Sequence, residues 1–417
     1  MTTSAAIEVA PSFTSSQRKL SFETHQNSGD EPAEPGRHTQ PVKTAPRDPR
    51  SEALPVFCMA LGTFAIGTEG FMIAPLLPDM ARDFGSPISQ VALLITVFTL
   101  TLAISSPLLT VTTARFNRRD LLIGTMLAFA AANLVAWASQ SFVGILVARI
   151  LLAVAAGLYI PNANALAGAI VRPERRGRAL AIVSGGMTIA IALGLPLGAL
   201  IGHSLGWRVT FFGVGVLAAT AALGLFLGLD KGAGGAVAVA SFRQRAQVAA
   251  TPAVFKALIV SAFWSVGAFI VYPFIAPYLA STLQFAEYGI SASVSLWGLS
   301  AAAGVVIGGY LNDRFGSARV IAPALGLLAA AFLVLALSNR LLPPDLAVLP
   351  VLFAIVLWGL TVWGFFPAQM AHLIGAGGIP SASVTLSLNT SVMYAGFALG
   401  STIGSVILAH DAIGSIE

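Results

Sequence analysis

Two ionisable residues lie within long apolar stretches of the sequence, where a charge is costly. Glu69, in the stretch 54–77, is the only one of 18 acidic residues inside a segment long enough to cross a bilayer. Arg149 is the only one of 23 basic residues well inside such a segment. A charge inside a membrane is expensive unless it meets a partner or a wet cavity. A carboxyl group whose charge depends on its surroundings can couple proton movement to another process.

The distances from the segment ends place the two residues at similar depth. Glu69 lies ten residues before Asp79, about 15 Å at the helical rise. Arg149 lies eight residues after Ser141, about 12 Å from the same side. Because arginine stays protonated and stabilises an ionised acid, protonation of Glu69 would release Arg149 if their helices are neighbours. The competing interpretation is a static ion pair that fixes two helices.

The composition indicates a polytopic helical membrane protein. Of the 417 residues, 56% are hydrophobic and 10% are charged, whereas soluble proteins contain about 25% charged residues. The sequence contains no catalytic constellation and no metal-ligand spacing, so we expect neither an enzyme nor a cofactor nor a nucleic-acid partner. Eleven apolar segments, each near the roughly 20 residues that cross a hydrocarbon core, predict transmembrane helices at 54–77, 91–113, 121–139, 143–170, 179–202, 209–229, 254–280, 291–311, 319–338, 347–374 and 381–409.

The basic residues predict the orientation and the charged stretches predict the division of the chain. With the N-terminus in the cytoplasm, 19 of the 23 Lys and Arg residues fall on the cytoplasmic side. Residues 1–50 are polar and predict a disordered cytoplasmic tail. Residues 230–253 have the composition of a cytoplasmic linker, which separates an N-terminal bundle of six helices (51–229) from a C-terminal bundle of five (254–417).

Motifs follow the order of the segments. The first segment holds the run Gly67–Asp79 around Glu69, and small residues follow Arg149 in the fourth. The basic loop Thr110–Arg119 after the second segment has a similar counterpart, Gly309–Gly316, after the eighth. The fifth segment carries small residues and a proline at Gly186, Gly194, Pro196, Gly198 and Gly202.

These motifs resemble those of the major facilitator superfamily, in its drug:proton antiporter branch close to bacterial sugar-efflux and arabinose-efflux-type permeases. The resemblance implies an all-α membrane fold of two six-helix bundles, in which the first and fourth helices are neighbours. Ala114 departs from the family because it replaces the acid of the first loop motif, while Asp313 keeps the acid in the second copy. The sequence also reaches Glu417 after eleven segments, so the twelfth helix is expected to be absent.

The resemblance assigns roles to residues of this chain. Glu69 and Arg149 become the proton-coupling pair. The gating and packing candidates are Arg115, Arg118, Arg119, Asp313, Arg314 and the fifth-segment residues Gly186, Gly194, Pro196, Gly198 and Gly202. Close helix packing and contact with lipid headgroups are the competing interpretations for these residues. In the family the first, fourth, seventh and tenth helices line the substrate cavity; with the eleventh, they offer Tyr159, Asn162, Asn164, Tyr272, Trp358, Trp363, Gln369, Asn389 and Tyr394.

The sequence therefore predicts a secondary transporter of the bacterial inner (plasma) membrane, with a cytoplasmic N-terminus. It would act as a monomeric antiporter, performing transmembrane transport by alternating access. Protons would drive the efflux of a small organic compound. That compound is a drug, a sugar or a metabolite, and efflux of a drug would give drug resistance. Two alternatives stay open. One is a uniporter or importer in which Glu69 binds substrate, and the other is a truncated membrane protein that does not transport.

Overall fold

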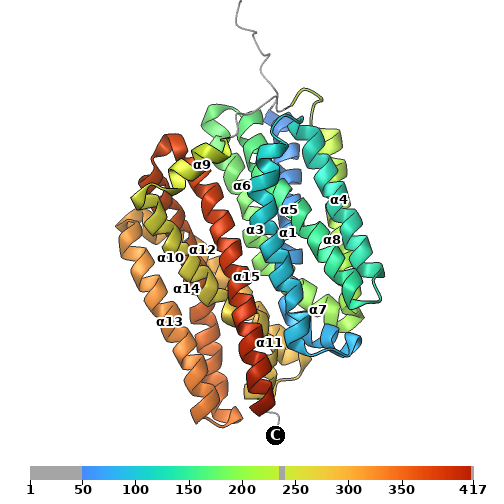
Figure 1. The fold of residues 1–417 in the computed structure, drawn as a ribbon, viewed down its shortest axis with the longest axis vertical. Helices are drawn as coiled ribbons and strands as arrows, with labels where there is room; N and C mark the ends of the chain where they lie inside the picture. Colours follow the sequence, from blue (N-terminus) through green and yellow to red (C-terminus); the bar gives the residue numbers. More distant parts are fainter. Residues whose placement is uncertain (1–48, 234–239, 415–417) are drawn as a thin grey trace, which may run out of the picture. The chain divides into compact units, whose positions relative to one another are not determined.

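The computed structural model describes residues 49–233 and 240–414, which form helices joined by short turns (Figure 1). The predicted tail 1–50 lies almost wholly outside these residues. The first set of helices is α1 (Pro49–Phe84), α2 (Ile88–Val91), α3 (Leu93–Thr112), α4 (Arg118–Ala138), α5 (Phe142–Ile170), η1 (Pro173–Arg175), α6 (Arg176–Ile189), η2 (Ala190–Gly194), α7 (Leu195–Leu205) and α8 (Trp207–Gly228).

A short helix, α9 (Phe242–Ala249), precedes the second set and lies within the predicted linker. Its start is fixed by a capping box, in which the side chains of Ser241 and Gln244 each accept a hydrogen bond from the backbone of the other residue. Residues 234–239 of that linker are outside the described part. The second set is α10 (Pro252–Val271), η3 (Tyr272–Phe274), α11 (Ile275–Leu283), α12 (Glu287–Phe315), α13 (Ser317–Leu341), α14 (Pro344–Gly377), η4 (Ile379–Ser381) and α15 (Ala382–Gly414).

Eleven of the described helical stretches are long and apolar enough to cross a membrane, in the predicted order. Several extend beyond the predicted bounds. The first span was predicted to end at residue 77 but continues to Phe84, past Pro75 and Pro78 inside α1. A proline removes only its own hydrogen bond, and neighbouring helices in a membrane protein support the helix around it. The chain is thus a multi-pass membrane protein.

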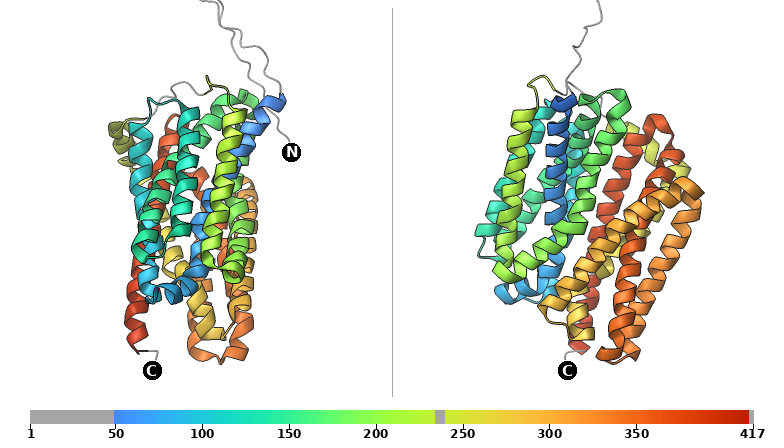
Figure 2. Two further views of the ribbon diagram at one scale, coloured as in Figure 1. Left: turned by 90° about the vertical axis from the view of Figure 1, so that its right-hand side faces the viewer. Right: turned by 180° about the vertical axis from the view of Figure 1, so that it is seen from behind.

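Each set packs mainly with itself. In the first set α1 contacts α5, α6, α7 and α8, while in the second set α12 and α13 pack on α14, and α10 packs on α15. The two sets lie beside one another (Figure 1, Figure 2) and meet where α3 contacts α15 and α12 contacts η2 and α7. The described residues belong to one compact unit, so the division into two moving bundles stays a prediction.

The two sides of the helix assembly differ in what they carry. We call the side at which α1 begins the basic side, because α4 begins there with Arg118 and Arg119. The side at which α1 ends, next to Arg82, is called the opposite side.

The predicted glycines of the fifth span all face α1. A Cβ atom added at Gly186, Gly194 or Gly202 would overlap Ala60, Thr68 or Leu76 respectively, and at Gly198 it would lie 2.8 Å from the Cβ of Met72. The span is not a regular α-helix, because η2 is a π turn that ends two residues before Pro196. The close-packing interpretation of these glycines matches the observed contacts.

Candidate functional site

Glu69 and Arg149 form an ion pair in the interior of the first set. Nη1 of Arg149, on α5, donates a hydrogen bond to Oε1 of Glu69, on α1. Both side chains are completely buried. The depths calculated from the sequence therefore correspond to a real contact. Breaking such a pair is costly, because either partner alone would be a buried, uncompensated charge.

A third helix, α3, also holds the arginine. Nε of Arg149 donates to the carbonyl oxygen of Leu94 at 3.2 Å. The guanidinium lies over the ring of Phe98, with its carbon 4.1 Å from the ring centroid. A cation over an aromatic face is attracted by the ring quadrupole, most strongly where water is excluded. Arg149 thus keeps two contacts that do not depend on the charge of Glu69.

The pair leaves hydrogen-bonding capacity unused. Oε2 of Glu69, Nη2 of Arg149 and Oγ1 of Thr68 are buried and have no hydrogen-bond partner within the described residues. Buried polar atoms are normally paired. A proton that binds to Oε2 would therefore displace no existing hydrogen bond to that oxygen. This geometry can switch between a carboxylate bound to Arg149 and a neutral acid.

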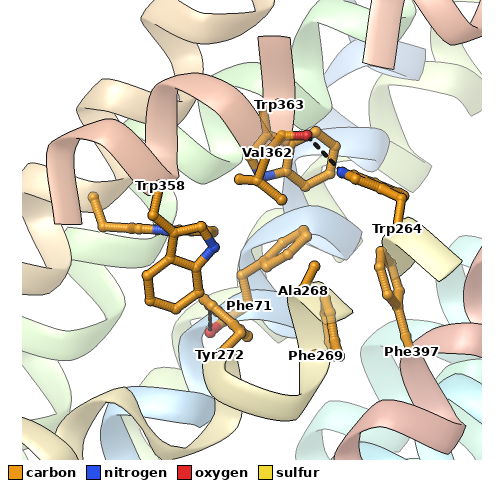
Figure 3. A pocket seen from close by; sticks show the side chains of 10 residues that line it. Phe71, Trp264, Ala268, Phe269, Tyr272, Trp358, Val362, Trp363 and Phe397 are labelled. Atoms are coloured by element: carbon orange, nitrogen blue, oxygen red, sulfur yellow. Dashed lines mark hydrogen bonds between the residues drawn. The ribbon is translucent and has the colours of Figure 1, made fainter. Parts of the chain in front are cut away.

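Aromatic side chains from both sets surround a small cavity of about 10 Å³ (Figure 3). Its aromatic lining comprises Phe71 from α1, Trp264 and Phe269 from α10, Tyr272 from η3, Trp297 from α12, Trp358 and Trp363 from α14 and Phe397 from α15. The hydroxyl of Tyr272 donates to the carbonyl oxygen of Phe71 at 2.9 Å, which links the two sets. About one water molecule fills this volume, so the cavity is closed to larger molecules in this conformation.

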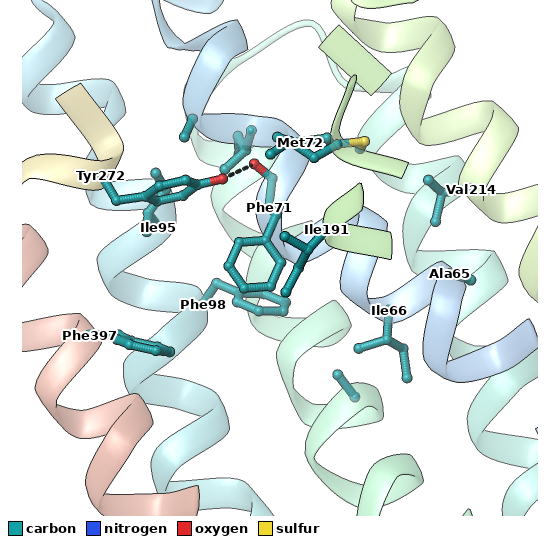
Figure 4. Packing of buried hydrophobic residues seen from close by; sticks show 14 of the residues in the cluster. Ala65, Ile66, Phe71, Met72, Ile95, Phe98, Ile191, Val214, Tyr272 and Phe397 are labelled. Atoms are coloured by element: carbon teal, nitrogen blue, oxygen red, sulfur yellow. Dashed lines mark hydrogen bonds between the residues drawn. The ribbon is translucent and has the colours of Figure 1, made fainter. Parts of the chain in front are cut away.

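A second cavity, of about 20 Å³, shares part of its lining with the first. Phe98, which contacts Arg149, lines this second cavity, and Phe71, Phe269 and Phe397 line both. Figure 4 shows Phe71 and Phe98 near one another, with Phe397 facing them from α15. Aromatic side chains therefore connect the arginine of the ion pair with the lining of both cavities.

Four of the nine predicted cavity residues line these cavities. Tyr272, Trp358 and Trp363 line the first and Tyr394 lines the second. The sequence did not single out Phe71, Phe98, Trp264, Trp297 or Phe397. Phe71, two residues after Glu69, had a local signal, whereas the others come together only through packing.

The other five predicted cavity residues make packing contacts and are not among the lining of these two cavities. The hydroxyl of Tyr159 donates to the carbonyl oxygen of Met59 at 3.1 Å, between α5 and α1. Nε2 of Gln369 donates to the carbonyl oxygen of Ala257 at 2.7 Å, between α14 and α10. Asn162 accepts from Arg118, Asn164 donates to the carbonyl oxygen of Ile160, and Asn389 lies 3.9 Å from the sulfur of Met370. A role in substrate binding stays a prediction for them.

The predicted gating residues lie on the basic side. Arg118 is buried and donates to Oδ1 of Asn162, while Arg119 donates to the carbonyl oxygens of Phe226 and Leu229 at the end of α8. Arg119 therefore stabilises the C-terminal end of that helix. Arg115, Asp313 and Arg314 are exposed, and Arg314 donates to the hydroxyl of Tyr310 at 3.2 Å. A latch between the two sets stays a prediction for all five.

A cross-set ion pair does occur on the opposite side, where the sequence did not predict one. Arg82, at the end of α1, lies 3.1 Å from Glu287, at the start of α12, and also pairs with Asp79. Nδ1 of His203 lies 2.6 Å from the second carboxylate oxygen of Asp79. The arginine and Glu287 are more than half exposed. This cluster joins the two sets at their surface.

Removing one charge from this pair is expected to separate the two sets slightly. In Glu287→Gln the population with the opposite side open should rise about fivefold or less, because an exposed ion pair contributes about 1 kcal/mol or less. Spin labels at Gln90 and Tyr288, in a chain whose free Cys58 is replaced by serine, would measure the distance distribution. Asp345→Asn removes an exposed carboxylate at the start of α14 and should change nothing. Equal distance distributions in the parent chain, the Glu287→Gln variant and the Asp345→Asn variant would show that the ion pair does not hold the two sets together.

Solved structures with the same fold are membrane transporters. A bacterial homologue of the human lysosomal transporter Spinster, in an inward-facing and occupied conformation, aligns with a TM-score of 0.70 and 21% identity over 88% of this chain and 85% of its own. The human organic anion transporter MFSD10 aligns with a TM-score of 0.64 and 17% identity, covering 87% of this chain and 94% of its own. At this identity the likeness concerns the fold.

Relatives by sequence are also transport proteins. A chloramphenicol resistance protein of Streptomyces lividans is 34% identical over 286 residues, 68% of this chain and 73% of that protein. YdhP, an inner membrane transport protein of Escherichia coli strain K12, is 27% identical over 85% of this chain and 89% of its own. YbcL, an uncharacterised transporter of Bacillus subtilis strain 168, is 28% identical over 87% of this chain and 90% of its own.

The family model described as Major Facilitator Superfamily matches residues 59–401. That range contains the buried ion pair and both aromatic cavities. Proteins of this family are membrane transporters and not enzymes. The model match, the helical fold and the transporter relatives lead to one conclusion: the chain belongs to the major facilitator superfamily.

Proposed function

We propose that this protein is a proton-coupled antiporter of the inner (plasma) membrane that expels a small organic compound by alternating access. The observation that carries the proposal is the completely buried pair of Glu69 and Arg149, whose second carboxylate oxygen has no partner within the described chain. A buried acid with an unused oxygen can take up a proton, and its charge then controls its contact with the arginine.

The geometry supplies a sequence of events for this coupling. When Glu69 is ionised, it holds Arg149 and so ties α1 to α5. A proton on Oε2 removes the attraction between the two side chains, while Arg149 keeps its contacts with Leu94 and Phe98 on α3. The helix α1 is then freer to move with Phe71, which lines both cavities. Loss of the proton on the other side of the membrane restores the ion pair and completes the cycle.

The proposed direction follows from the orientation. With the basic side in the cytoplasm, 19 of the 23 Lys and Arg residues lie inside, in agreement with the positive-inside rule. Protons entering from outside would then drive compounds outward. The relative named as a chloramphenicol resistance protein supports a small organic compound as substrate and an efflux role in drug resistance. Because the ion pair and both cavities lie within one chain, a monomer suffices.

Proton flux in response to the substrate tests this proposal. The full chain would be placed in everted membrane vesicles that hold an acidic interior and a pH-sensitive dye. Addition of chloramphenicol should release protons from the vesicles, and an uncoupler should abolish uptake of the compound. Vesicles without the protein provide the control. Uptake that proceeds equally with an uncoupler would identify a uniporter and contradict antiport.

A further inference from the structure

Two indole groups in the first cavity have unused donors. Nε1 of Trp297 and Nε1 of Trp358 have no hydrogen-bond partner in the described chain, although the side chains are 2% and 0% exposed. Of the other two indoles in the lining, those of Trp264 and Trp363, Trp264 donates to the carbonyl oxygen of Val362 at 3.1 Å. Tyrosine and tryptophan normally find a partner for their polar atom when they are buried. The fold therefore leaves the donors of two neighbouring rings unsatisfied.

The rings that carry these two donors lie close together in an aromatic surrounding. The rings of Trp297 and Trp358 are edge to face, with centroids 5.5 Å apart, and the ring of Tyr272 lies 4.8 Å from that of Trp297. No carboxylate belongs to the lining of this cavity. An indole N–H can only donate, so a ligand must supply acceptor atoms. Aromatic faces alone would also attract a cation, but the two N–H groups present the positive ends of their dipoles.

One residue of the first set closes the cavity. Phe71 lies edge to face against Tyr272 and Trp363, with centroid distances of 5.8 Å to each, and its carbonyl oxygen accepts from the Tyr272 hydroxyl. The other aromatic residues of the lining come from the second set (Figure 3). If α1 moves away from η3 and α14, Phe71 leaves and the indoles become accessible. The closed volume of about 10 Å³ is thus a property of this conformation.

We propose that this cavity is the substrate site and that it selects an uncharged, planar aromatic compound with acceptor oxygens, such as a nitro or carbonyl group. The rings stack on the compound, and Trp297 and Trp358 donate to its oxygens. Trp297 belongs to α12, the eighth span, which was not among the spans expected to line the cavity. This inference rests on the proposed function, since it names the compounds that the transporter would expel.

Equilibrium binding to the purified full chain tests the site without any proton gradient. The probes are radiolabelled chloramphenicol and 4-nitroacetanilide, compared with the cation tetraphenylphosphonium and the sugar arabinose. Trp297→Phe and Trp358→Phe keep an aromatic ring but remove the donor. Each should weaken binding of the two nitroaromatic probes about two- to tenfold, the range expected for one hydrogen bond. Trp137→Phe, at an exposed tryptophan of α4 outside the lining of this cavity, should leave binding of both probes unchanged.

A second measurement uses the unaltered sequence, so it does not depend on the folding of the variants. With ¹⁵N-labelled tryptophan, two of the six indole N–H resonances should move downfield when either nitroaromatic probe is added. Failure of both probes to bind or to move two resonances would overturn the assignment. Preferential binding of tetraphenylphosphonium or arabinose would overturn the compound class. Because these measurements need no gradient, loss of proton coupling with intact binding would contradict only the proposed function.

Discussion

Replacing Glu69 by glutamine is expected to reduce proton-driven transport to the level of vesicles without the protein. Glutamine has the shape of the protonated acid, but it cannot release a proton or attract Arg149 as an ion. The variant should therefore behave like the protein with Glu69 permanently protonated. Substrate exchange down its own gradient, which needs no change in protonation, should persist. The measurements are substrate-induced proton release and counterflow in the same vesicles, with protein amounts matched by immunoblot.

Glu69→Asp provides the matched control for this prediction. It keeps an ionisable carboxyl group near Arg149 and shortens the side chain by one methylene, so part of the proton-driven transport should return. Recovery with aspartate but not with glutamine would separate the charge from the shape of the side chain. Equal proton release by the Glu69→Gln variant and the natural chain would show that the ion pair only fixes α1 to α5.

Replacing Gly308 by valine is expected to prevent stable packing of α12 against α14. A Cβ atom at Gly308 would overlap the carbonyl group of Gly364, and one at Gly304 would overlap that of Leu360. Because the neighbouring atoms belong to the backbone, a rotamer change cannot relieve the overlap. Overpacking typically costs about 1–3 kcal/mol, and a backbone clash belongs to the upper end. The apparent Tm in detergent should fall by roughly 5–10 °C, or the protein should fail to purify as a single species.

The adjacent glycine is a control with the same change in helix propensity. A Cβ atom at Gly309 would lie 4.0 Å from Pro367, an ordinary contact distance, so Gly309→Val should keep the Tm within a few degrees. Similar losses in both variants would attribute the effect to valine within α12 and not to the contact with α14. The comparison can be made by thermal unfolding followed by size-exclusion chromatography.

The sequence was sufficient to predict the membrane-spanning helices and one contact of the candidate site, the pairing of Glu69 with Arg149. Apolar length set the eleven spans, and the depths of Glu69 and Arg149 matched because both were measured from segment ends on the same side. The aromatic cavity was only partly predictable. Its eight aromatic residues come from six helical elements, and their meeting depends on rotations and tilts that local patterns do not encode. The fourth span shows the same limit, because Tyr159 and Asn162 face neighbouring helices in the observed rotation.

Tertiary contact also decided which charged residues pair. The loop motif directed attention to the basic side, yet the pair that joins the two sets, Arg82 and Glu287, is on the opposite side. These residues are 205 positions apart, and no local motif connects them. The extension of α1 beyond residue 77 brings Arg82 to this position. A small error in the end of one helix was enough to hide the contact.

The π turn in the fifth span has a consequence for chain length. Eight residues separate Gly186 from Gly194, which in a regular α-helix would turn the second glycine about 80° away from the first. A π turn takes up one additional residue, so the offset falls to about 20° and both glycines meet α1. Deleting one residue from 190–193 would therefore leave both glycines on the same face. The same deletion in the middle of α14, which is continuous over 34 residues, would rotate everything beyond it by about 100°. A homologue one residue shorter at this turn would keep the contact with α1 unchanged.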